Sequence, residues 1–367
     1  MNRSQASAGL KQEIGTLTQA MDRIAPERTV VFMEVCGTHT MSFRRNGLQE
    51  LVPERVQLIS GPGCPVCVTP VEYVDHAIAL AQQHDVILAT FGDLVRVPGS
   101  YTSLEQSRAD GARVEVVYSP LDALNLARKH PDRQVVFLAV GFETTAPVVA
   151  SSVIQAEREH LENYSALSAH KVIPPAMLAL AQADDLALDG FMCPGHVSVV
   201  IGMNAYAPIA QAANLPCVVT GFEPTDMLQG LLMLVSQARQ ETAKVENQYL
   251  SVVRPEGNPR ARAAMDQVFE VCDSRWRGLG NMPLSGLTFR KEYARFDAAR
   301  RFSVNLPDPV EPPGCQCGAV LRGVTQPEDC PLFGNRCTPR SPVGACMVSS
   351  EGTCAAHFRY RSVNQAT

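Results

Sequence analysis

The chain has 367 residues, of which 46% are hydrophobic and 19% charged, and its formal net charge is −5. A chain of this length predicts two or three domains, and its apolar content excludes a wholly disordered protein. The small acidic excess argues against a general nucleic-acid binder, which needs surplus Lys and Arg to neutralise phosphates.

The sequence also argues against a membrane or secreted protein. It contains no apolar run of the roughly 18 residues that a membrane span requires. Residues 1–24 lack the apolar segment of a secretory signal, so we expect a cytoplasmic protein. Cytoplasmic thiols stay reduced, yet the chain has 12 Cys. Such a count in a reducing compartment indicates metal binding or redox chemistry more than structural disulfides.

Strand and helix patterns alternate along the first 240 residues. Residues 7–24 predict an amphipathic helix that ends before Pro26. Buried strands are predicted from short apolar, often β-branched runs at 29–35, 56–59, 86–91, 114–118, 135–140, 191–192 and 217–220. Helix-period stretches lie at 71–83, 121–129 and 225–239. This alternation predicts an α/β fold with mainly parallel sheets. A Gly-Phe-Glu tripeptide follows a predicted strand at both 141–143 and 221–223. This repeat could come from two duplicated α/β halves or from a chance match of three residues.

After about residue 300 the sequence becomes rich in Pro and Cys. Six of the 12 Cys lie there: Cys315, Cys317, Cys330, Cys337, Cys346 and Cys354. The Pro residues exclude long helices and central strands, so the segment needs another source of order, such as a bound metal. The spacing matches neither a ferredoxin run nor paired zinc knuckles, and it favours an iron–sulfur cluster over zinc. A zinc-stabilised binding module remains the alternative.

The first motif with possible chemistry is MEVCGTHT at 33–40. It follows a predicted buried strand, and the carboxyl ends of such strands are where open α/β sheets bind ligands. Cys36 and His39 could bind one metal ion, or the imidazole could activate the thiol. Equally, Cys36 could be a small buried hydrophobe beside a surface His.

The second motif is GPGCPVCVTP at 61–70, which also follows a predicted strand. We expect Thr69 and Glu72 to form a capping box, which would put Cys64 and Cys67 just before a helix N-terminus. The helix dipole lowers the thiol pKa there, so the pair suits a reversible dithiol/disulfide or half of a metal site. The alternative is a tight turn that happens to contain two Cys.

Further polar residues follow other predicted strands, each beside a Gly. They are Asp93, Arg96, Glu143, His196 and Glu223. Taken singly, each is more typical of a turn or a helix cap than of catalysis. Their shared position at strand ends suggests that some of them line one cleft.

Together these blocks resemble the HypD family of hydrogenase maturation factors. The resemblance lies in MEVCGTHT, GPGCPVCVTP, FGDLVRVPGS (91–100), GFETTAP (141–147), PGHVS (194–198), GFEP (221–224) and the tail from 314 to 360. Many members have a second Gly and a further His in the first motif, where this chain has Thr38 and Met41. A role for that further His therefore does not carry over.

The resemblance implies a fold with two Rossmann-like α/β domains and a small [4Fe–4S] domain similar to that of ferredoxin:thioredoxin reductase. We expect them at 1–135, 136–300 and 301–367. It also implies a scaffold on which the Fe(CN)2CO unit of [NiFe]-hydrogenases is assembled, together with a HypC-type chaperone and a HypE-type cyanide donor. Such a scaffold is not a turnover enzyme in the usual sense.

The resemblance also implies roles for individual residues. Cys36 would hold the Fe(II) that carries cyanide and CO, with His39 and Asp93 beside it, and Cys64 and Cys67 would be a redox pair. For the cluster we expect Cys317, Cys330, Cys337 and Cys354, with Cys315 and Cys346 as alternates. The rival hypothesis is an iron–sulfur disulfide oxidoreductase, although such an enzyme has no need of a third thiol at Cys36.

Overall fold

The computed structural model describes residues 3–361, which form two parallel β-sheets, a long hairpin and a Cys-rich tail. Within these residues sheet A has five parallel strands in the order β2-β1-β7-β8-β9. They are β1 (Val30–Glu34), β2 (Val56–Ser60), β7 (Gly190–Pro194), β8 (Cys217–Thr220) and β9 (Val245–Asn247). The three central strands are almost wholly buried, as their continuous apolar runs predict.

Sheet B has four described strands in the order β4-β3-β5-β6, again all parallel. They are β3 (Val86–Thr90), β4 (Val114–Val116), β5 (Gln134–Ala139) and β6 (Tyr164–Ser168). When strands are numbered within each sheet, sheet B follows the doubly wound order 2-1-3-4 and sheet A follows 2-1-3-4-5, so the predicted α/β fold is confirmed. In this order ligands bind at the carboxyl ends of the first and third strands, where the chain changes direction across the sheet.

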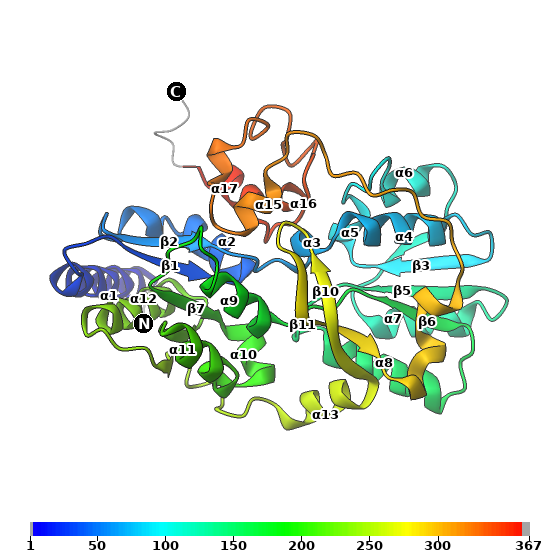
Figure 1. The fold of residues 1–367 in the computed structure, drawn as a ribbon, viewed down its shortest axis with the longest axis horizontal. Coiled ribbons are helices and arrows are strands. Elements are labelled where there is room, and N and C mark those ends of the chain that lie inside the picture. The colour runs from blue at the N-terminus through cyan, green and yellow to red at the C-terminus, as the bar shows by residue number, and fades with distance from the viewer. Residues whose placement is uncertain (1–2, 362–367) are drawn as a thin grey trace.

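Helices connect the strands and cover the sheets (Figure 1). Those nearest sheet A are α1 (Arg3–Ile24), α2 (Gly37–Arg45), α9 (Ile173–Ala181), α10 (Gly195–Ile201), α11 (Ala207–Ala213) and α12 (Pro224–Arg239). Those of the sheet B half are α4 (Val71–Ala81), α5 (Gly92–Val95), α6 (Leu104–Ala109), α7 (Pro120–Lys129), α8 (Ala146–Arg158) and α13 (Pro259–Val268). The amphipathic helix predicted at 7–24 is α1, which packs against α12. No helix in the described part of the chain is both long and apolar enough to span a membrane.

The two sheets do not follow one another along the chain. Sheet A combines strands from 30–60 with strands from 190–247, and sheet B is formed by residues 86–168 between them. The domain boundary expected at 135/136 therefore falls inside β5, a central strand of sheet B. Parallel strands need a crossover of about a dozen residues or more, but two strands far apart in the chain can still be neighbours in a sheet, so local sequence patterns do not reveal which strands share a sheet.

A hairpin and the tail complete the structure. The hairpin, absent from the sequence prediction, is formed by β10 (Phe269–Trp276) and β11 (Gly280–Phe289) and runs between the two halves (Figure 1). The tail has only short helices: α14 (Ala298–Arg301), α15 (Cys317–Leu321), α16 (Ala345–Val348) and α17 (Thr353–Arg359). Single-turn 3-10 helices lie at Leu48–Glu50, Met203–Tyr206 and Pro327–Asp329, with a longer one at Lys291–Phe296.

The tail packs on the body through one apolar cluster. That cluster joins side chains of sheet A, the short helix α3 (Pro65–Val68), the hairpin and the tail. Helix α16 contacts α3, and α17 contacts α2. The Cys-rich tail thus lies directly over the two segments that carry the Cys motifs of the N-terminal region.

Candidate functional site

Four strands direct their carboxyl ends toward one cavity of about 430 Å³, which we call the Cys36 cavity. The residues that follow β1, β2, β5 and β7 line it, and one tail residue does so too. Its polar and sulfur-bearing lining residues are Cys36, Thr38, Thr144, Thr145, His196 and Glu351. The cavity therefore lies at the switch point of sheet A and is closed by residues from sheet B and the tail.

Cys36 is the N-cap residue of helix α2, and it is buried. Its backbone N–H donates a 2.9 Å hydrogen bond to Oε2 of Glu34, and the Thr40 hydroxyl donates to the other oxygen of that carboxyl group. Burial raises the pKa of the Cys36 thiol to about 12, although the backbone N–H of His39 opposes this rise. The thiol is thus protonated at neutral pH unless a metal ion displaces its proton.

Two glycines let other segments approach Cys36 closely. A Cβ atom on Gly63 would lie 2.2 Å from the backbone nitrogen of Cys36, and one on Gly37 would lie 2.4 Å from the carbonyl oxygen of Glu351. The Gly37 N–H donates to the Gly63 carbonyl at 3.0 Å. The second Cys motif and the tail are therefore both held against the start of α2, through contacts that no larger residue permits.

His39 is fully buried, but its ring is directed toward the end of β8. Its Nε2 lies 3.1 and 3.0 Å from the carbonyl oxygens of Thr220 and Gly221, so this nitrogen carries the proton. Burial lowers the pKa of His39 to about 4, and the ring is neutral at pH 7. Its Nδ1 is buried without a hydrogen-bond partner. Among the described residues no hydrogen bond joins the His39 ring to the Cys36 thiol.

Exposed His196 and half-buried Glu351 form the rim of the cavity. The His196 ring stacks on Phe222, with the ring centroids 3.9 Å apart. Phe222 also makes a tilted contact with the His39 ring, at 4.8 Å between centroids. The Thr38 hydroxyl donates a 2.8 Å hydrogen bond to Oε1 of Glu351. Burial lowers the pKa of His196, and the negative charge of Glu351, supplied by the tail, opposes this lowering.

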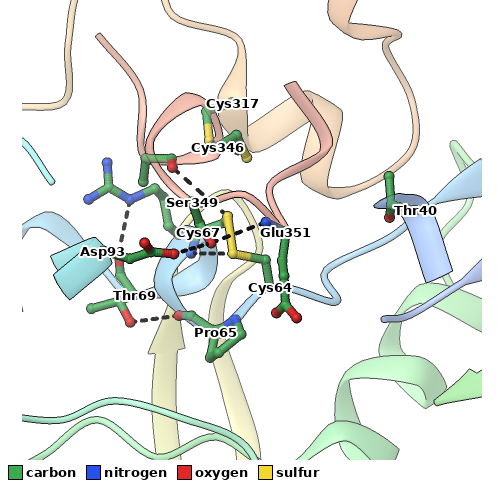
Figure 2. The surroundings of a disulfide bond; sticks show 12 residues. Thr40, Cys64, Pro65, Cys67, Thr69, Asp93, Cys317, Cys346, Ser349 and Glu351 are labelled. Carbon is green, nitrogen blue, oxygen red and sulfur yellow. Dashed lines mark hydrogen bonds between the residues drawn. A yellow bond between two sulfur atoms is a disulfide. The ribbon is translucent and has the colours of Figure 1, made fainter. Parts of the chain in front are cut away.

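Cys64 and Cys67 are joined by a disulfide on the one-turn helix α3 (Figure 2). Cys64 is the N-cap of this helix, and its Sγ accepts a 3.2 Å hydrogen bond from the Cys67 N–H. The expected capping box is wrong, because Thr69 is instead the C-cap of α3 and α4 begins after Pro70. The pair still lies at a helix N-terminus, but the helix is α3, which contains Cys67, and not the following helix α4.

Asp93 and Arg96 contact the tail rather than the cavity. Oδ2 of Asp93 accepts a 2.8 Å hydrogen bond from the Ser349 hydroxyl (Figure 2). The Arg96 guanidinium donates to the carbonyl oxygen of Pro339 at 2.8 Å. Both residues follow β3 of sheet B, so this half of the body holds the tail through one carboxylate and one cation.

Glu143 and Glu223 have different surroundings. Glu143 is buried, its Oε1 accepts a 2.9 Å hydrogen bond from the Ile173 N–H, and its Oε2 has no partner. Burial raises the pKa of Glu143 to about 7. Glu223 is exposed and caps helix α12 through a capping box with Asp226. Glu223 therefore fits the alternative reading of a helix cap, and it does not line the Cys36 cavity.

The six tail Cys are gathered within the tail and are mostly buried; only Cys315 is half-exposed. Cys346 lies at the centre, with its Sγ 2.9 Å from that of Cys317 and in contact with Cys354. Neighbouring thiols and the Arg277 cation lower the pKa of Cys317. No three His, Cys, Asp or Glu side chains within residues 3–361 are arranged as the ligands of a single metal ion.

Comparison with known proteins identifies the family. The family HypD, described as "Hydrogenase formation hypA family", matches residues 11–361. The chain belongs to this family. It is 49% identical to the hydrogenase maturation factor HypD of Azotobacter vinelandii, over 96% of both chains. It is 47% identical to HypD of Escherichia coli K12, over 91% of this chain and 90% of that one. These HypD relatives do not favour the alternative of a disulfide oxidoreductase.

Two carboxylates of the candidate site were not predicted from the sequence. Glu34 is buried at the end of β1 and holds the Cys36 backbone, and Glu351 lines the cavity from the tail. A charged residue within the apolar run 30–35 could have signalled Glu34, because a carboxylate is buried in a strand only where it has partners. Glu351 carries no such signal, since its position depends on how the tail folds back.

Proposed function

We propose that this chain functions in hydrogenase maturation, as a scaffold that holds an iron ion while cyanide and CO ligands are added. The observation that carries the proposal is the convergence of Cys36 and the Cys64–Cys67 segment on one cavity beneath a Cys-rich tail. The names of the HypD relatives, hydrogenase maturation factors, support the same function. The iron and its ligands are the cargo of this site.

Cys36 is the proposed iron ligand. A soft thiolate suits a low-spin Fe(II) that carries cyanide and CO. The thiol is buried and protonated, so binding iron requires that its proton leave. The backbone N–H groups at the start of α2 favour the resulting thiolate. His39 is neutral and His196 lies at the rim, and both imidazole rings contact Phe222.

The tail Cys suit a [4Fe–4S] cluster, because six free thiols lie in this one short segment and five of them are buried. When bound, such a cluster stores and passes single electrons. The proposed ligands are Cys317, Cys330, Cys337 and Cys354. Cys346 is the stronger of the two alternates, since it is buried among the others while Cys315 is half-exposed.

The Cys64–Cys67 disulfide is the proposed redox pair. Its reduction takes two electrons and two protons, breaks the S–S bond and leaves two thiols. The Cys67 Sγ lies 4.0 Å from the carbonyl oxygen of Ala345, the residue before Cys346, so the pair lies next to the tail (Figure 2). Electrons would come from an external reductant by way of the tail.

The proposed partners are a HypC-type chaperone, which shares the iron, and a HypE-type donor of cyanide. We place this assembly in the cytoplasm. Neither nucleic acid nor a membrane is part of the proposal. The cavity rim formed by His196 and Glu351 is open to solvent, which leaves a route by which a partner could reach Cys36.

Infrared spectroscopy of the chain co-purified with its chaperone tests the function. The wild-type complex should show cyanide and CO stretching bands. Cys36→Ala should lose them, because neither Ala nor Ser binds Fe(II) with comparable affinity, while its thermal unfolding stays near that of the wild type. Cys272→Ala, at a half-exposed Cys on the hairpin, is the matched control and should keep the bands. If the bands persist in Cys36→Ala, the proposal is wrong about Cys36 and another residue binds the iron.

A further inference from the structure

Arg277, at the turn of the β10–β11 hairpin, is a buried cation that the proposed function has not used. Its side chain is only 3% exposed. Its backbone N–H donates to the Val68 carbonyl at 2.8 Å, and its Nε donates to the Thr69 carbonyl at 2.9 Å. Its Nη1 pairs with Oε2 of Glu311 at 2.9 Å. Arg277 is therefore fixed to the C-terminal end of the helix that carries Cys67.

One nitrogen of this guanidinium remains without a partner. Nη2 is buried and makes no hydrogen bond. A charged donor left without an acceptor in the interior destabilises the folded protein, so such a group points to a missing acceptor. The guanidinium lines a cavity of about 390 Å³ together with Cys315 and Cys317. The acceptor that fits this place is a sulfur atom of the tail site.

Backbone packing fixes Arg277 beside the tail Cys. Gly278 follows Arg277 with φ near +80°, and a Cβ atom there would lie 2.3 Å from the Cα of Gly318. Gly318 is in turn the residue after Cys317. The hairpin turn and the start of α15 thus meet backbone to backbone, which holds Arg277 beside Cys317 at the same cavity.

We infer that Arg277 is a positioning residue that directs its free N–H and its charge at the Cys317 sulfur and raises the reduction potential of the cluster bound there. The inference rests on the proposed binding of a cluster by the tail. Reduction adds negative charge, and a buried cation that is weakly screened stabilises the reduced form. Hydrogen bonds to cluster sulfurs act in the same direction.

Replacing Glu311 should change the reduction potential of the cluster in the direction opposite to replacing Arg277. Its carboxylate pairs with Arg277 and also acts on Cys317, but its side chain is 54% exposed. Removing this negative charge leaves the guanidinium uncompensated, so the potential should rise. Arg275 is the matched control, because it is a nearby cation at the end of strand β10, is 58% exposed and pairs with Glu72.

The experiment is a redox titration of anaerobically reconstituted protein, followed by the visible absorbance of the cluster. Arg277→Gln should shift the potential to more negative values, Arg277→Lys should shift it less, and Glu311→Gln should shift it to more positive values. Arg275→Gln should leave it unchanged, since solvent screens that charge. Thermal unfolding of each variant checks that the fold is kept.

The outcomes separate the two hypotheses. A cluster whose potential is the same in Arg277→Gln and Glu311→Gln as in the wild type would overturn the inference and leave the proposed cluster standing. A wild-type chain that binds no cluster would overturn both. If Arg277→Gln fails to fold, Glu311→Gln decides: a potential that does not rise contradicts the inference.

Discussion

Glu143 is a residue whose protonation should control stability at neutral pH. Its pKa in the folded protein is about 7, compared with 4.5 in its unperturbed state. Between these pH values the folded form keeps a proton that the unfolded form has lost, so stability falls as pH rises through this window. The shift corresponds to a loss of about 3 kcal/mol once the pH is above 7.

Replacing Glu143 by Gln should remove this dependence, because the amide cannot ionise and its oxygen can still accept from the Ile173 N–H. We expect the free energy of unfolding of Glu143→Gln to change less between pH 5 and pH 8 than that of the wild type. Denaturant unfolding at the two pH values measures it. Glu34, His39 and His170 titrate in both proteins, so the difference between them isolates Glu143. Equal changes would show that Glu143 is ionised in the folded state.

Residue-level expectations succeeded where chemistry is local. A thiol at the end of a buried strand was expected at Cys36, and strand β1 is as the sequence pattern predicts. The sequence did not predict helix α2, which begins directly after Cys36 and contains His39. The sequence could not show the direction of the His39 ring, because its partners at Thr220 and Gly221 are 181 and 182 residues away. The cap at Thr69 was mistaken because Cys64, a residue seldom found at N-caps, occupies that position for an earlier helix.

Among the elements, α3 should make its two thiols unequal after reduction. Cys64 is at the N-cap, where helix N–H groups stabilise a thiolate, and Cys67 is fully buried in the last turn. We expect Cys64 to react first when the reduced protein is treated with iodoacetamide. Mass spectrometry of peptides taken over time measures the order. Faster labelling of Cys67, or no labelling of either after reduction, would contradict this expectation.

Three of the strands that the sequence did not predict share a physical reason. Strands β6 and β9 are short and lack a long β-branched run. In strand β10 only the first and last residues are fully buried, and most of the residues between them are exposed. Its sequence therefore lacks the apolar run from which a buried strand can be predicted. Each of these strands exists because a partner is available: β6 pairs with β5, β9 with β8, and β10 with β11. Tertiary pairing overrides local propensity in such cases.

At the scale of the whole molecule, the tail should act as a cover over Cys36. Ser349 binds Asp93, and Glu351 binds Thr38, so a three-residue stretch ties the tail to both halves of the body. Ser349→Ala should loosen this stretch and increase the rate at which Cys36 is alkylated, measured by mass spectrometry. Ser341→Ala, an exposed serine of the tail, should not. An unchanged rate in Ser349→Ala would mean that the cover is held without this bond.

Strand pairing across the whole molecule decides how the domains are organised, and a sequence does not show this pairing. The Gly-Phe-Glu tripeptides follow β5 and β8, which are the third strand of sheet B and the fourth strand of sheet A. They therefore occupy different places in two sheets whose first four strands have the same order, and the tripeptide is no evidence of duplication. The shared order 2-1-3-4 is visible only once the pairing is known.

The split of sheet A has a consequence for the newly made chain. About 130 residues separate the end of β2 from the start of β7, the strand that must pair with β1. At roughly 5–20 residues per second, the ribosome makes that partner about 7 to 25 seconds later. Until then β1 has an open edge, and Cys36, Cys64 and Cys67 have neither their cavity nor their cover. The first cysteines to be synthesised are thus among the last to be enclosed, which makes this interval the one in which oxidation or adventitious metal would do most harm.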